Sequence, residues 1–192
     1  LALLALWPTG PLSAQLSWSG RLGATYTTPM VTDQVSGSVI EMRAGISPTL
    51  GLEGSYPLPG PAGLSASAEL QMTAGAFERH EGGTATRVGD LRTFAFSAGL
   101  RGKLVSAVTW RAGIGIVSYL TTEETSVFQD DRPTRLLGTG ALEYRRRLSP
   151  LFSLVGLLRY DVHGFTSQQL ASTGYTGQQT VHRMSVGVGV AR

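Results

Sequence analysis

The sequence predicts an all-β fold, an eight-stranded antiparallel up-and-down barrel, and three observations support this prediction. Apolar and polar residues alternate along eight segments of the chain. The connections between these segments are alternately short and long. Glycine is abundant, at 25 of 192 residues, whereas charged residues make up only 15% of the chain, well below the usual quarter. A low charge content of this kind argues against a long disordered polar chain.

The alternation is clearest in residues 64–74, where even positions are apolar and odd positions are polar. Successive side chains of a strand point to opposite faces, so this pattern indicates a strand with one apolar face. The same pattern predicts strands over residues 16–28, 38–56, 63–77, 91–104, 107–121, 134–147, 151–165 and 179–191. Pro48 lies inside the second of these segments and removes one ladder donor, so we expect a bulge or a local break there.

The connections differ in length and composition. Short ones are expected at residues 57–62, 103–107 and 148–150, and longer polar ones, rich in Gly, Thr, Ser, Asp and Gln, at residues 29–37, 78–90, 122–133 and 166–178. Four long loops at one end and three short turns at the other leave both chain ends on the short-turn side. This is the layout of an outer-membrane barrel with an even number of strands.

Aromatic residues on the apolar face fall into two bands. Those expected near the short-turn end are Trp18, Tyr56, Trp110, Tyr144 and Phe152, and those expected towards the long-loop end are Tyr26, Phe94 and Tyr160. Two aromatic bands separated by aliphatic residues match the girdles of a membrane barrel. The sequence therefore predicts an eight-stranded antiparallel up-and-down transmembrane β-barrel with short periplasmic turns and longer extracellular loops.

The opposite face of the strands carries most of the charges. We expect an interior charge network of Arg21, Glu41, Arg43, Glu53, Glu69, Arg101, Arg111, Glu143, Arg145, Arg159 and Asp161, joined by Lys103 and Arg183. An eight-stranded barrel is just wide enough for side chains to fill it, and buried charges must pair or be hydrated. We therefore predict a lumen filled by Arg–Glu pairs and trapped water, without an open pore. Arginine's planar fork suits this pairing, and Lys103 is the only lysine among the 16 basic residues.

Glycine is frequent inside the predicted strands, where it normally weakens a strand. These glycines stand at positions 45, 51, 75, 99, 102, 113, 115, 138, 140, 156, 187 and 189. In a narrow barrel, we expect them to make room for large inward side chains and to permit strong curvature.

The first fourteen residues are expected to lie outside the barrel. Their apolar run, Leu1 to Trp7, is broken by prolines and a glycine and ends at Ala14, as in the apolar and cleavage regions of a secretory signal peptide. We expect residues 1–14 to be a signal-peptide remnant and residues 15–192 to form the barrel domain. The mean hydropathy is +0.06, and no run of about 20 apolar residues exists, which excludes a helical membrane protein. The absence of cysteine excludes disulfides and thiolate metal sites.

Three strand-type segments, SAGLRGKL (97–104), WRAGIGIVSY (110–119) and SVGVGVAR (185–192), complete a resemblance to small outer-membrane β-barrel proteins of Gram-negative bacteria. That group includes the OmpA transmembrane domain and the OmpX-like proteins. The resemblance is architectural and covers about residues 15–192. It implies a location in the outer membrane, and contacts with its lipid, with lipopolysaccharide and with the barrel-assembly machinery.

No motif for catalysis, metal binding or cofactor binding is evident, so we expect no enzyme activity, no cofactor and no metal. The cations are dispersed over strands, so the isoelectric point of about 9.6 does not imply nucleic-acid binding. The expected function is a structural anchor of the envelope, or an adhesion protein that presents a surface ligand site on loops 78–90 and 122–133. One alternative is a lipid A-modifying enzyme that uses Asp161, His163 and Ser167. Another is a soluble exported lipocalin-like barrel that binds an apolar ligand and exposes its charges to solvent.

The run Arg145 to Arg147 is the one basic cluster of the sequence. On a strand, Arg146 would point away from the other two arginines, near the periplasmic rim. It could contact a lipid phosphate or a partner there. The alternative is interior pairing of Arg145 and Arg147 with interfacial snorkelling of Arg146.

Overall fold

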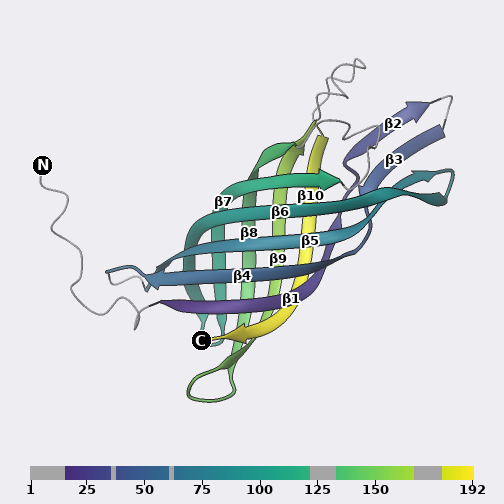
Figure 1. Ribbon diagram of the computed structural model, residues 1–192. Helices are drawn as coiled ribbons and strands as arrows, with labels where there is room; N and C mark the ends of the chain where they lie inside the picture. The colour runs from purple at the N-terminus through teal and green to yellow at the C-terminus, as the bar shows by residue number, and fades with distance from the viewer. Residues whose placement is uncertain (1–15, 36–37, 61–62, 122–132, 167–178) are drawn as a thin grey trace, which may run out of the picture.

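The computed structural model describes residues 16–35, 38–60, 63–121, 133–166 and 179–192, and all regular structure in these residues is β-strand. The ten strands are β1 (Ser17–Thr27), β2 (Val31–Val35), β3 (Ser38–Ala44), β4 (Ser47–Pro57), β5 (Ser65–Glu81), β6 (Thr84–Val105), β7 (Val108–Thr121), β8 (Thr134–Arg147), β9 (Ser153–Phe165) and β10 (Gln179–Ala191) (Figure 1). No helix long and apolar enough to span a membrane occurs in this part of the chain.

Eight of these strands form a closed ring. Its order is β1, β4, β5, β6, β7, β8, β9, β10, and the ring closes by pairing of β10 with β1. Every neighbouring pair is antiparallel. The predicted eight-stranded antiparallel barrel is therefore confirmed, and the limits predicted for β8 and β10 agree with those observed.

The ring closes with a stagger between its strands. From Leu70 on β5, the row of paired residues passes through β4, β1, β10 and β9 to Arg146, at the short-turn end of β8. Followed the other way, through β6 and β7, the row from Leu70 meets β8 at Leu136, ten positions earlier. Such a stagger tilts the strands against the barrel axis. Rows followed from β1 through β10 and β9 to β8 consequently descend toward the short-turn end.

The two faces of the ring strands differ sharply in character. Odd-numbered residues of the ring strands point inward and are mostly polar, whereas even-numbered residues point outward and are mostly apolar. Leu22, Ile114 and Leu136 on the outer face are 64%, 77% and 83% exposed. The eight aromatic residues expected in the girdles are all partly or largely exposed. Apolar side chains are thus outside, and polar ones inside.

The prediction of one continuous strand over residues 38–56 was wrong, because two strands occupy this segment. β3 ends at Ala44, β4 begins at Ser47, and both pair with β5. The break falls just before Pro48, near the position expected for it. Ala44 and Ser47 are both buried although they are three positions apart, so inward and outward positions are exchanged across the break.

The prediction of long loops at residues 78–90 and 29–37 was wrong, because both segments contain strand. Instead of a loop over 78–90, β5 and β6 continue as a hairpin that turns at Gly82 and Gly83, whose φ angles are +56° and +84°. Glycine adopts such positive φ angles at no steric cost. The expected loop 29–37 contains β2, which pairs with β3. Residues 122–132 and 167–178 of the other two loops lie outside the described residues, as do residues 1–15.

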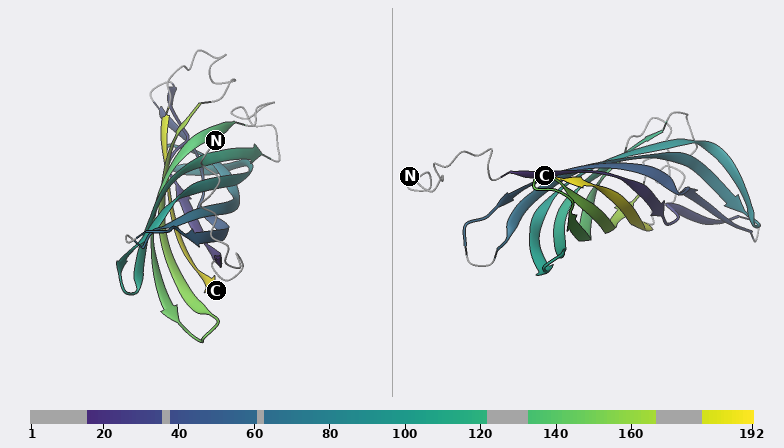
Figure 2. Two further views of the ribbon diagram at one scale, coloured as in Figure 1. Left: turned by 90° about the vertical axis from the view of Figure 1, so that its left-hand side faces the viewer. Right: turned by 90° about the horizontal axis from the view of Figure 1, so that it is seen from below.

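These additions form a second, smaller sheet that continues the wall of the barrel. In it, β2 pairs with β3, β3 with the upper part of β5, and β5 with the upper part of β6. Figures 1 and 2 show these strands extending well past the ring, away from the end that carries the C-terminus. We call them the projecting sheet.

Inward-facing glycines line two opposite seams of the ring, β6–β7 and β1–β10. At Gly115 on β7, an added Cβ would overlap the carbonyl oxygen of Phe96 on β6; at Gly23 on β1, it would overlap that of Val186 on β10. Gly99, Gly113 and Gly189 are similarly crowded by neighbouring backbone. The seams separate two groups of four strands, and Figure 1 shows β4, β5 and β6 running across the view in front of the steep β8, β9 and β10. Close backbone approach at these glycines permits the strong curvature of the ring.

Candidate functional site

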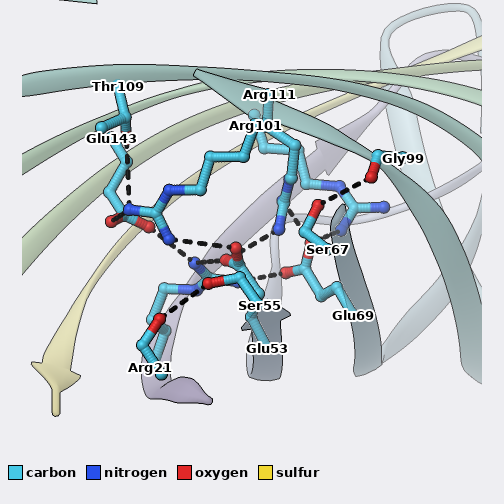
Figure 3. Close-up of polar contacts among 12 residues, drawn as sticks. Arg21, Glu53, Ser55, Ser67, Glu69, Gly99, Arg101, Thr109, Arg111 and Glu143 are labelled. Atoms are coloured by element: carbon cyan, nitrogen blue, oxygen red, sulfur yellow. Dashed lines mark hydrogen bonds and ion pairs between the residues drawn. The ribbon is translucent and has the colours of Figure 1, made fainter. Parts of the chain in front are cut away.

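Four carboxylates from four different strands converge inside the barrel. Glu53, Glu69, Glu143 and Asp161 lie on β4, β5, β8 and β9, and each is at most 5% exposed. All four occupy inward-facing odd positions. Figure 3 shows the three glutamates surrounded by arginine side chains from other strands.

Glu69 contacts three arginines of this charge network. Arg21 Nη2 donates a hydrogen bond to its Oε1 at 2.6 Å, and Arg159 Nη1 and Arg111 Nη2 both contact its Oε2. The two oxygens of one buried carboxylate thereby meet guanidinium groups from β1, β7 and β9. Charge-assisted contacts of this kind are the stronger class of hydrogen bond.

Glu53 and Glu143 extend the network to the remaining arginines. Arg21 Nη1 lies 2.6 Å from Glu53 Oε2 and 3.1 Å from Glu143 Oε2. Arg111 Nη1 lies 2.8 Å from Glu53 Oε2, and Arg101 contacts both glutamates. With Arg159, whose Nε donates to Asp161 Oδ1 at 2.7 Å, the network joins every ring strand except β10.

The charges inside the barrel nearly balance. The buried arginines are Arg21, Arg101, Arg111, Arg159 and Arg183, and the buried acids are Glu53, Glu69, Glu143 and Asp161. Arg183 on β10 donates from Nη2 to Thr93 Oγ1 at 3.1 Å. Desolvation of an ion costs several kcal/mol, about as much as a well-made buried pair restores. The network is therefore better suited to fixing the relative positions of the strands than to adding net stability.

The structure brings together most of the residues expected in the interior. Arg21, Glu53, Glu69, Arg101, Arg111, Glu143, Arg159 and Asp161 are buried there, as is Arg183. Arg145 lies at the short-turn mouth, where it meets Glu143 at 3.1 Å with its side chain 30% exposed. Lys103 is exposed.

Glu41 and Arg43 were wrongly assigned to the interior network. They belong to β3, in the projecting sheet, where they pair with His80 and Glu78 of β5. The exchange of faces between Ala44 and Ser47 is the physical reason. Arg43 Nη2 donates to His80 Nδ1 at 3.2 Å instead.

Sequence reasoning missed an apolar cluster that fills the barrel at the end opposite the short turns. It consists of Met30, Val31, Ala44, Phe77, Leu91, Ala95, Val117, Tyr119, Leu137, Phe165 and Val181. Most of these residues stand at odd, inward positions near the far end of their strands. Large apolar residues at these odd positions were the signal, because such positions are otherwise polar. The cluster lies between the charge network and the outer part of the projecting sheet, which contributes Val31 and Ala44 to it.

His163 faces inward, at the boundary between the apolar cluster and the charge network. It is 4% exposed and hydrogen-bonds through Nε2 to the Tyr119 hydroxyl. Tyr119 also packs edge-to-face on Phe165, with ring centroids 5.4 Å apart. Asp161 is buried on the same face, and Ser167 lies outside the described residues. This histidine is walled off from the outer surface, where a lipid substrate would lie.

The other two histidines lie away from the interior. His182 Nδ1 is 2.6 Å from the Tyr160 hydroxyl, and this contact is exposed. His80 Nε2 is 2.9 Å from Glu78 Oε2 in the projecting sheet. Among the described residues, no group of three or more His, Cys, Asp or Glu side chains is placed to hold a metal ion.

A polar vestibule of about 230 Å³ opens at the short-turn end of the barrel. Arg101, Lys103 and Arg145 line it together with Ser17, Ser55, Ser65, Ser106 and Thr109. Arg101 and Arg145 both contact Glu143. From this mouth inward, the lumen thus passes from the vestibule through the charge network to the apolar cluster.

The projecting sheet carries paired, solvent-accessible charges. Arg79 Nη2 donates to Glu81 Oε2 at 2.7 Å, and Arg87 pairs with Asp90. The side chains of the Arg79–Glu81 pair are 45% and 46% exposed. Exposed pairs contribute little to stability, so these groups remain available to a partner.

Comparison with known proteins finds no matching family model and no matching curated protein. Solved structures do match. One is Ail, the attachment invasion locus protein of Yersinia pestis, in complex with the heparin analogue sucrose octasulfate: identity is 12%, the TM-score is 0.51, and 93% of this chain and 99% of that chain are covered. Another is Neisserial surface protein A, with 10% identity, a TM-score of 0.56, and 92% and 95% of the two chains covered. At these identities the likeness concerns the fold, which this chain shares with small surface barrels of Gram-negative bacteria.

Proposed function

We propose that this chain is a non-enzymatic adhesion or ligand-presenting protein, anchored by its barrel in the outer membrane of a Gram-negative bacterium. The observation that carries the proposal is the projecting sheet, which continues the barrel wall beyond the ring. A barrel that serves only as an anchor has no need for strands of this length. The filled lumen serves as rigid support rather than as a pathway.

The outer surface supports a position in a membrane. Large apolar side chains project from every ring strand, and those of Leu50, Leu70, Phe96, Leu158 and Val186 are 45–58% exposed. Soluble proteins rarely expose continuous apolar surface on this scale. The soluble lipocalin-like alternative requires the reverse arrangement, because its apolar ligand would occupy a lumen that here holds charged side chains.

The upper part of β6 supports binding of a partner. Among the described residues, most of residues 84–90 pair with β5 alone, because pairing with β7 begins at Leu91. Unpaired backbone groups on such an edge can recruit an extended peptide segment. The paired charges of Arg79, Glu81 and Arg87 lie beside this edge and can exchange their partners for those of a ligand. The proposed ligand is therefore an extended segment of a surface protein, or an anionic glycan of the kind bound to Ail.

Trimming the projecting sheet tests this role. In one variant, residues 78–88 are replaced by an Asn-Gly turn, which suits a two-residue hairpin and leaves Phe77 in the apolar cluster. We expect bacteria that carry this variant to lose most of their binding to cultured epithelial cells and to immobilised heparin. The barrel should still form, as shown by a heat-dependent mobility shift on SDS gels.

The matched control is Arg147→Ala, which removes an exposed arginine at the short-turn end of β8 and leaves the projecting sheet unchanged. Binding should stay within about twofold of that of the parent protein, because Arg147 lies at the opposite end of the barrel and surface substitutions of this kind usually cost at most about 0.5 kcal/mol. If the trimmed protein forms its barrel and binds cells as well as the parent, the proposed role of the sheet is wrong.

A further inference from the structure

A hollow of about 670 Å³ lies on the outer face of the ring, across β8, β9, β10 and β1. Its lining is apolar and consists of Leu22, Gly23, Ala24, Leu142, Tyr144, Gly156, Leu157, Leu158, Val186, Gly187 and Val188. The volume falls within the range of about 300–1,000 Å³ that is usual for small-molecule sites. We call this hollow the outer groove.

Two rows of outward residues form the outer groove. One row joins Leu142, Leu158, Val186 and Ala24, and the other joins Tyr144, Gly156, Val188 and Leu22. Gly156 leaves its place in the second row empty, because an added Cβ there would meet nothing within 4 Å. Leu22 and Val188, each 64% exposed, stand on the far side of this gap. The groove exists because small residues alternate with branched ones on neighbouring strands.

The outer groove has a direction relative to the membrane. Rows followed from β1 to β8 descend toward the short-turn end, so Tyr144 marks the low end of the groove. Arg146 is the next outward residue of β8, about 7 Å beyond Tyr144, and it is exposed. A cation therefore stands at the mouth of an apolar channel, at the level where the short turns meet the aqueous phase.

We propose that the outer groove binds one glycerophospholipid of the periplasm-facing leaflet. One acyl chain lies along the groove from Tyr144 toward Ala24, and the phosphate pairs with the guanidinium of Arg146. Apolar walls match the chain, and a guanidinium can bind two phosphate oxygens at once. The phenol of Tyr144 lies at the depth of the glycerol backbone. This inference rests on the proposed position of the barrel in the membrane.

Native mass spectrometry of the detergent-purified barrel with added palmitoyl-oleoyl phosphatidylglycerol tests the site. The parent protein should retain one lipid. Gly156→Leu fills the gap in the groove and Arg146→Gln removes the cation, and each should lower retention about tenfold, the effect of losing roughly 1.4 kcal/mol. Dioleoylglycerol, which lacks a phosphate, should bind the parent protein and Arg146→Gln equally.

Two matched controls separate the groove from general effects. Gly54→Leu adds the same side chain at another outward glycine with open space around it, on β4. Arg147→Gln removes the adjacent cation, which donates to the Ser149 carbonyl at 3.2 Å. Both should retain the lipid within about twofold of the parent protein.

The mobility shift of unheated samples, measured in parallel, distinguishes two kinds of failure. A parent protein without a shift would contradict the membrane-anchored barrel itself. A normal shift with equal retention by Gly156→Leu and Gly54→Leu, or by Arg146→Gln and Arg147→Gln, would overturn the lipid site alone. If Gly156→Leu lowers the yield of barrel, the comparison of Arg146→Gln with Arg147→Gln still tests the lipid site, because Arg146 lies outside the lumen.

Discussion

Replacing Glu69 by alanine is expected to destabilise the barrel strongly. The two carboxylate oxygens of Glu69 contact Arg21, Arg111 and Arg159. Its loss would therefore leave three buried guanidinium groups with fewer carboxylate partners. Removing one partner of a buried ion pair typically costs about 3–5 kcal/mol. The free energy of unfolding, measured by urea titration of the barrel in phospholipid vesicles, should fall by about that amount.

Glu81→Ala is the control for this substitution. Glu81 also pairs with an arginine, but its side chain is 46% exposed on the projecting sheet. The cost should be about 0–1 kcal/mol. A loss for Glu69→Ala no larger than that for Glu81→Ala would contradict the assignment of Glu69 to a desolvated charge network.

Replacing Gly115 by alanine is expected to impair closure of the β6–β7 seam. The new Cβ would overlap the carbonyl oxygen of Phe96 and lie 2.7 Å from the Cα of Ser97. These are backbone atoms of a paired strand, so relief requires the two strands to move apart. Overpacking of this kind costs about 1–3 kcal/mol, and the yield of heat-shifted barrel after refolding into vesicles should drop.

Gly54→Ala is the control, and it is expected to stabilise the folded protein slightly. An added Cβ at Gly54 meets nothing within 4 Å, and alanine restricts the unfolded chain more than glycine does. Such substitutions stabilise by about 0.4–1 kcal/mol where the backbone is compatible. If Gly115→Ala and Gly54→Ala refold equally well, close approach at the seams is not what shapes the ring.

The ring itself was predictable from the sequence because one physical requirement dominates it. A barrel wall with lipid outside and paired charges inside imposes period-two alternation on every strand, as residues 64–74 display. Such alternation sets the number of ring strands and predicts the observed limits of β8 and β10. The arginines and acids of the network could be assigned to the lumen by the same parity, except where parity is broken at Gly45 and Ile46.

The projecting sheet could not be predicted in this way. Beyond the apolar cluster, side chains on both faces of β5 are partly or largely exposed, so the run Glu78, Arg79, His80, Glu81 shows no alternation and resembles a loop. Its strands are held by backbone pairing, by continuity with the barrel and by the burial of Val31 and Ala44 in the apolar cluster, which leave only a short hydrophobic signature. The apolar cluster was missed for a different reason, since its members interrupt an inner face whose other positions are polar.

The outer groove depends on register, which the sequence does not reveal. Gly156, Val188 and Leu22 are far apart in the chain and become neighbours only because β9, β10 and β1 pair as they do. A shift of two residues in the β1–β10 pairing would place Gly20 or Ala24 beside Val188 instead of Leu22, and would change the shape of the groove. Shape on the lipid-facing surface is therefore a property of the closed ring.

The central claim is that β5 spans the membrane with its even positions toward lipid and its odd positions toward a packed lumen. The chain has no cysteine, so single cysteines at Ser67, Leu70, Met72 and Thr73 can carry a nitroxide spin label without background. In vesicles, labels at positions 70 and 72 should collide freely with oxygen and poorly with a water-soluble nickel chelate, whereas labels at 67 and 73 should be shielded from both. Equal accessibility of all four positions, or strong collision of the nickel chelate at 70 and 72, would contradict the account.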